Sequence, residues 1–229
     1  MANLSKKVLG TVSGAVGDIL FRAKNGKNYV GTRPLSFIPG RDENSVARRQ
    51  RFAMATRLAR PINSIYQLKS VWRNFTPAGL SPYNMIVKSN YINVQPDSVS
   101  DLVRLVPDIG FSVQINNMIV DENHLNVTIA GLTSNSGIDP LVELNFQMVG
   151  VMHLSNPVNI EQQVGHSFMR LVTDEQVLAL NTEINFDLTF YDQTSQLIAQ
   201  YQDRRVFLTL LTLDVNKQVV HYSNTFFNN

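Results

Sequence analysis

The chain has 229 residues, of which 44% are hydrophobic and 17% charged, and its formal net charge is +2. This length can bury a sizeable core in one large domain or two modest ones. The absence of cysteine excludes disulfide bonds and thiolate metal sites. No apolar run approaches the ~18 residues of a membrane helix, and the first residues lack the apolar core of a signal peptide. We therefore expect synthesis in the cytoplasm and no membrane span.

The small net charge conceals a strong division along the chain. Residues 1–95 contain 15 Lys and Arg but only 3 Asp and Glu, whereas residues 96–229 contain 5 Lys and Arg and 15 Asp and Glu. Such a division of charge indicates what the protein binds rather than how it folds. We expect the basic part to contact an anionic surface, which is either nucleic acid or the acidic part of another copy in a head-to-tail assembly.

The first 36 residues are predicted to be extended. Glycines recur between their apolar residues, and each glycine would cost a helix ~1 kcal/mol relative to alanine. The dipeptide Asn25-Gly26 is typical of a tight β-turn and predicts a hairpin over residues 19–33. A segment this rich in glycine has too few core residues to stand alone, so we interpret it as an assembly arm that adds strands to a neighbour. The candidate arm residues are Gly10, Gly14, Gly17 and Tyr29.

A basic helix is predicted to follow. Asp42 or Asn44 can cap its N-terminus, and Pro61 is expected to kink or interrupt it. Arginine binds phosphate and carboxylate equally well through its planar fork. We favour a solvated or subunit-facing basic surface here and keep contact with a nucleic-acid backbone, through Arg48, Arg49, Arg51 and their neighbours, as the alternative. The candidate anion- or partner-binding residues are Arg33, Arg41, Arg48, Arg49, Arg51, Arg57 and Arg60.

Two shorter helices complete the basic part. Apolar residues at spacings of three or four predict a second helix over residues 62–72. Ser81 is a suitable N-cap followed by a proline at the first helical position, which predicts a third helix over residues 82–90.

The pattern changes after residue 96 to about eight short, alternating apolar segments. Segments at this spacing predict an antiparallel β-sandwich. We expect its strands to begin at Phe111, His124, Leu141, His166, Ile184, Leu197, Val206 and Lys217. We expect turns at Asn116-Asn117, Ser136-Gly137, Asn156-Pro157, Asp192-Gln193 and Asp203. The sequence therefore predicts a mainly β protein, with a basic arm, hairpin and two to three helices in residues 1–96 and an acidic β-sandwich domain in residues 97–229.

Several unusual segments of the first half resemble a known family. They are VLGTVSGAVGDILF, NGKNYVGTRP, NSVARRQRFAMATRLA and SPYNMIVKSNY, in that order. Over residues 8–91 this pattern is similar to the Bacteroidetes proteins of the DUF6266 family, which has no established activity. The resemblance implies a bacterial or phage source, and the recurrence of similar segments in prophage-like contexts favours a virion component.

The sequence contains no recognisable catalytic or metal-binding constellation. His124, His153, His166 and His221 lie in or beside predicted strands without the close spacing of zinc ligands. Residues 10–17 lack the Gly-Lys-Ser/Thr of a phosphate loop, and no serine has a G-x-S-x-G context. A carbohydrate-binding sandwich remains open but is disfavoured, since the C-terminal part has no tryptophan. We therefore expect a non-enzymatic structural or assembly protein without cofactor, metal or small-molecule substrate. It would form homo-oligomers and contact other structural proteins in a phage capsid, connector or tail.

Overall fold

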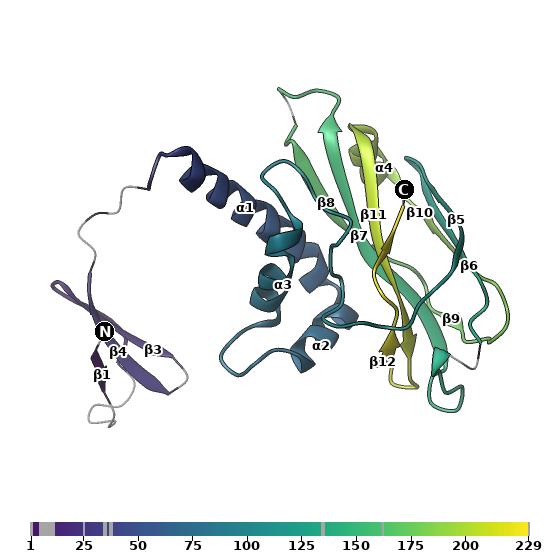
Figure 1. Cartoon of the computed structure of the whole chain (residues 1–229), viewed down its shortest axis with the longest axis horizontal. Coiled ribbons are helices and arrows are strands. Elements are labelled where there is room, and N and C mark those ends of the chain that lie inside the picture. The colour runs from purple at the N-terminus through teal and green to yellow at the C-terminus, as the bar shows by residue number, and fades with distance from the viewer. Residues whose placement is uncertain are drawn as a thin grey trace. The chain divides into compact units, whose positions relative to one another are not determined.

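A computed structural model describes residues 2–4, 12–24, 26–33, 36, 39–133, 136–161 and 163–228 (Figure 1). The chain divides into two compact units, Met1–Val46 and Ala47–Asn229. No helix among the described residues is long and apolar enough to cross a membrane.

The N-terminal unit is an antiparallel sheet with the strand order β1-β4-β3-β2. Its strands are β1 (Ala2–Leu4), β2 (Gly14–Val16), β3 (Ile19–Lys24) and β4 (Lys27–Thr32). The pairing of β3 with β4 confirms the predicted hairpin, and Gly26 supplies the positive φ of +73° that its turn requires. Gly10 and Asn25, which we assigned to the arm and the turn, lie outside the described residues.

The helices of the second unit are α1 (Glu43–Ser64, which begins just before it), α2 (Tyr66–Asn74), α3 (Pro82–Asn90) and the 3-10 turn η1 (Tyr91–Asn93). Two predicted N-caps are confirmed by their hydrogen bonds. The Asp42 carboxylate accepts the backbone N–H of Ser45 at 2.9 Å, and the Ser81 hydroxyl accepts that of Asn84 at 3.2 Å. Both helices therefore begin where the sequence indicates.

The predicted interruption at Pro61 is wrong. α1 continues through Pro61, and the chain leaves the helix at Ile65, whose φ of −78° and ψ of 116° are extended. Proline removes one helical hydrogen bond and crowds the preceding turn. Leu58 and Ile62, on either side of Pro61, are fully buried, and their packing offsets this cost.

Two antiparallel sheets form the rest of this unit. The larger, six-stranded sheet contains β7 (Asn145–Pro157), β8 (His166–Val172), β9 (Gln176–Val177), β11 (Tyr201–Leu213), β12 (Val219–Tyr222) and β13 (Phe226–Phe227). The smaller, three-stranded sheet contains β5 (Ile115–Val120), β6 (His124–Ile129) and β10 (Ile184–Thr189). A short helix, α4 (Asp192–Ala199), precedes β11.

The unit has three layers, with the six-stranded sheet in the middle (Figure 1). On one face Val149 and Val151 pack in a core with the helices, and on the other Met148 and Met152 pack in a core with the three-stranded sheet. Successive side chains of a strand point to opposite faces, so β7 is buried on both. The mainly β fold and the sandwich are thus confirmed. Because the helices share a core with the sheet, the compact division falls at residue 46, whereas we expected it at residue 96.

Several predictions in the sandwich are wrong, among them the turns at Asn156-Pro157, which form the end of β7, and at Asp192-Gln193, which begin α4. The segment that begins at Leu197 is not a strand, because it continues from α4, whose Ile198 is fully buried. Phe111 forms only an isolated bridge to Ser223, and the strand begins at Ile115. The predicted turn at Asn116-Asn117 is a register shift inside β5, which a β-bulge accommodates. Asp203 lies inside β11, opposite Ser155.

Candidate functional site

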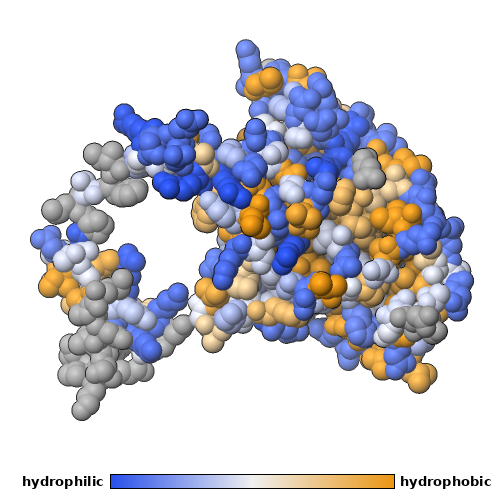
Figure 2. All heavy atoms as spheres, in the orientation of Figure 1, coloured by the Kyte–Doolittle hydropathy of each residue, from blue (hydrophilic) through white to orange (hydrophobic). Residues whose placement is uncertain are grey.

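The charge division of the sequence follows the layers of the second unit. Residues 47–96, which include most of α1 and all of α2 and α3, contain eight Lys and Arg and no Asp or Glu. Figure 2 shows strongly hydrophilic side chains gathered over α1. Elsewhere in this unit, Arg204, Arg205 and Lys217 form ion pairs with carboxylates. The helical layer therefore presents positive charge on one face of the sandwich.

Arg51 has an internal role. Its Nε donates to the carbonyl oxygens of Tyr91 and Val94 at 2.9 and 2.8 Å, and its Nη2 donates to that of Ile92 at 3.0 Å. The guanidinium also lies 4.7 Å from the centre of the Tyr91 ring. These carbonyls lie where α3 and η1 end and lack helical partners. Arg51 therefore connects α1 to the segment in which α3 and η1 end. We do not count it as part of the exposed basic surface.

The other predicted arginines do not form one site. Arg33 and Arg41 are exposed and belong to the N-terminal unit, as do Gly14, Gly17 and the half-buried Tyr29. Arg48 and Arg49 are exposed near the start of α1.

Arg57 and Arg60 are exposed further along α1 and line a shallow depression of about 250 Å³. The remaining wall of the depression is formed by Pro61, Val164, His166, Ser167 and Phe168. Here the described structure brings two of the predicted arginines to a common concave surface.

A pair of histidines lies beside this depression. Nε2 of His153, on β7, is 3.1 Å from Nδ1 of His166, on β8, and the His153 ring stacks on Phe168 at 4.6 Å between centres. Burial, together with the charge of His166, lowers the pKa of His153 to about 4. Burial and the Arg57 charge lower the pKa of His166, which Asp97 partly opposes. We expected His153 and His166 to be ordinary strand histidines, because only the β7–β8 register brings them together.

A second histidine contact was also missed. Glu143 is 1% exposed, and its Oε1 accepts the backbone N–H of Asp139 at 2.8 Å and lies 3.1 Å from Nδ1 of His221. His221 in turn lines a cavity of about 430 Å³ beside α2 and β12. A carboxylate in this position orients the imidazole ring. Nowhere in the described residues do three His, Asp or Glu side chains gather as a metal site.

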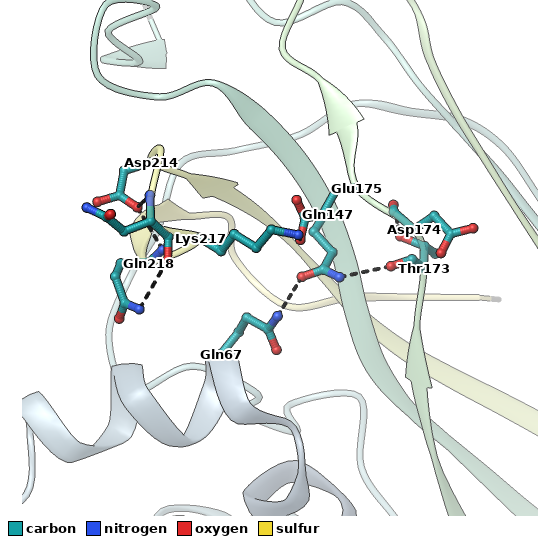
Figure 3. A network of polar contacts seen from close by, with 9 residues as sticks. Gln67, Gln147, Thr173, Asp174, Glu175, Asp214, Lys217 and Gln218 are labelled. Carbon is teal, nitrogen blue, oxygen red and sulfur yellow. Dashed lines mark hydrogen bonds and ion pairs between the residues drawn. The ribbon is translucent and has the colours of Figure 1, made fainter.

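A polar seam joins the helical layer to the sheet (Figure 3). Gln67 of α2 donates to Oε1 of Gln147 on β7, and Gln147 donates to the carbonyl of Thr173 just after β8, both at 2.9 Å. Lys217 pairs with Glu175 at 2.9 Å nearby. Because Gln147 is buried and both its amide oxygen and its amide nitrogen have a partner, we assign the seam a structural role.

No family model and no curated protein match this chain. A β-glucosidase from Kluyveromyces marxianus is among the solved structures that resemble part of it, with a TM-score of 0.15 and 11% identity. That match covers 52% of this chain and 14% of the glucosidase chain. A likeness of this size carries no information about fold or activity.

Proposed function

We propose that this protein is a non-enzymatic structural subunit of a multi-copy assembly and that its N-terminal sheet docks to another copy. The observation that carries the proposal is that one face of this sheet carries apolar side chains, of which Val16 and Ile19 are exposed among the described residues. The virion setting rests on the resemblance of residues 8–91 to the DUF6266 family.

The apolar face follows from the strand register. Val16 pairs with Ile19, and Phe21 pairs with Val30, so these four side chains lie on the same face. Val16 is 70% exposed and Ile19 46% exposed. Among the described residues from 12 to 46, only Asn28 is buried. The opposite face carries Leu20, Arg22, Lys24, Lys27 and Tyr29.

A small sheet with its apolar face in water is marginally stable, whereas each Å² of apolar surface that it buries contributes about 25 cal/mol. A second copy is the partner that every molecule in an assembly meets. The basic charge of residues 1–95 and the acidic charge of residues 96–229 favour a head-to-tail contact, in which the N-terminal part of one copy meets the sandwich of the next.

Two neighbouring residues of β2 provide the test, because they lie on opposite faces of the sheet. We expect the wild-type chain to form oligomers in multi-angle light scattering and Val16→Asp to shift it to monomers, since a charge on the apolar face opposes its burial. Ala15→Asp, on the other face, should leave the oligomer intact. A wild-type monomer at all concentrations and salt levels, or equal behaviour of the two variants, would contradict the proposal.

A second candidate is a nucleic-acid-associated protein, favoured by the eight cations and no anions of residues 47–96. Arg48 and Arg49 would then contact the phosphate backbone. Binding to unrelated DNA sequences that falls steeply with salt would favour this function, and no binding at low salt would remove it.

A further inference from the structure

Arg57 and Arg60 line the same concave surface. They are three residues apart on α1, which places them on neighbouring positions of the helix surface. Both line the depression of about 250 Å³ that His166 closes from β8. Two guanidinium groups and an imidazole from separate layers therefore meet at one place.

The positive charge of this depression is not compensated within it. In the part of the chain that the structure describes, no carboxylate lines it. No hydrogen bond or ion pair of Arg57 or Arg60 to another described residue is found, in contrast to the three carbonyl contacts of Arg51. Asp97 lines the adjacent depression, which Arg57 also borders. Like charges three residues apart on a helix repel each other, and an anion bound between them would remove this repulsion.

We propose that Arg57, Arg60 and His166 form a binding site for a phosphate group. The planar fork of arginine donates two parallel hydrogen bonds to phosphate oxygens. The residues of this site all belong to the second unit, and none of them lies on the apolar sheet face that the oligomer test changes.

The histidine pair supports a dianionic ligand. Protonated His166 donates its Nδ1–H to Nε2 of His153, 3.1 Å away, and leaves its Nε2–H for the ligand. His153 suits this acceptor role because burial keeps it neutral above about pH 4. Burial and the Arg57 charge lower the pKa of His166, and the Asp97 charge raises it. The hydroxyl of Tyr201, on β11, donates to the carbonyl oxygen of Val164 at 2.9 Å and is therefore not counted among the donors to the ligand. A bound dianion offsets the Arg57 charge, so phosphate binding and protonation of His166 reinforce each other.

The test is a titration of the full-length protein with inorganic phosphate, followed by the NMR signals of the histidine rings. We expect saturable shifts at His166 and a higher His166 pKa in phosphate, with His221 as the internal reference. Arg57→Gln/Arg60→Gln should weaken phosphate binding about tenfold or more and abolish the phosphate-dependent pKa rise. Arg73→Gln/Lys88→Gln removes two exposed charges from α2 and α3, outside the depression, and should bind within about twofold of wild type.

Two further titrations identify the source of the anion. Acetate should bind far more weakly than phosphate, because it cannot satisfy two arginine forks and an imidazole. A single-stranded oligonucleotide should show no advantage over free phosphate. Three outcomes would each overturn the proposal. Acetate could bind as tightly as phosphate, or both double variants could weaken oligonucleotide binding to the same extent. A folded wild-type protein could also show no saturable shift at His166.

Discussion

The arginines of α1 show that residue type and position on a helix do not decide a residue's role. Arg51 and Arg57 are less than two turns apart on the same helix. Arg51 donates to three carbonyl oxygens and is part of the framework, whereas Arg57 lines a shallow depression and has no hydrogen bond to another described residue. The difference lies in what other parts of the chain bring to each guanidinium.

His153 makes the stability of the second unit depend on pH. Burial lowers its pKa from 6.5 to about 4. Between pH 6.5 and pH 4 the imidazole is therefore protonated in the unfolded chain and neutral in the folded chain. The stabilising contribution is complete above about pH 6.5 and is lost as the pH falls toward 4. We expect the free energy of unfolding to fall by up to about 3 kcal/mol over this window because of His153.

Chemical denaturation of wild type and His153→Gln at several pH values measures this contribution. The variant cannot titrate at this position, so the stability advantage of the wild type should shrink as the pH falls. His124→Gln, at an exposed position, is the matched control for the loss of an imidazole. A wild-type advantage that stays constant from pH 7 to pH 4 would rule out the assigned role.

At the scale of elements, the central strands β7 and β11 are positioned by close backbone contact. Gly150 of β7 lies opposite Leu208 of β11. A Cβ added at Gly150 would lie 2.0 Å from the carbonyl oxygen of Phe207. The absence of a side chain at this position is therefore a requirement of the sheet.

We expect Gly150→Ala to destabilise the protein by about 2 kcal/mol or more, because β7 and β11 would have to separate. Gly165→Ala is the control, since its Cβ would meet no heavy atom within 4 Å. That change should leave the melting temperature unchanged or slightly raised. Thermal unfolding compares the two, and a Gly150→Ala variant as stable as wild type would show that the contact is not as close as described.

Elements were predicted best where local chemistry alone decides them. Ser81 and Pro82 define the start of α3 through one hydrogen bond and one fixed φ. The interruption at Pro61 and the strand from Leu197 were predicted wrongly, because burial against the sheets outweighs local preference there.

At the scale of the whole molecule, both hydrophobic cores lie in the second unit. Their buried members run from Met54 to Leu213 in one core and from Leu125 to Phe226 in the other. The described part of the N-terminal unit contributes to neither. Its sheet is therefore not needed for the second unit to fold.

We expect deletion of residues 1–40, which keeps the Asp42 cap of α1, to leave the melting temperature nearly unchanged. The same deletion should abolish oligomers in light scattering, since it removes the apolar sheet face. Calorimetry and scattering on one sample separate the two effects. A large loss of thermal stability would show that the N-terminal sheet belongs to the fold of its own chain.

The sequence by itself determined the mainly β class, the hairpin, the caps of α1 and α3 and the opposed charges, because each depends on residues that are neighbours in the chain. Only the tertiary structure decided that the helices share a core with the sheet, that Arg51 is internal, and that His153 and His166 meet beside Arg57 and Arg60. These contacts join residues far apart in sequence. Strand register and layer packing bring them together, and no local pattern encodes either.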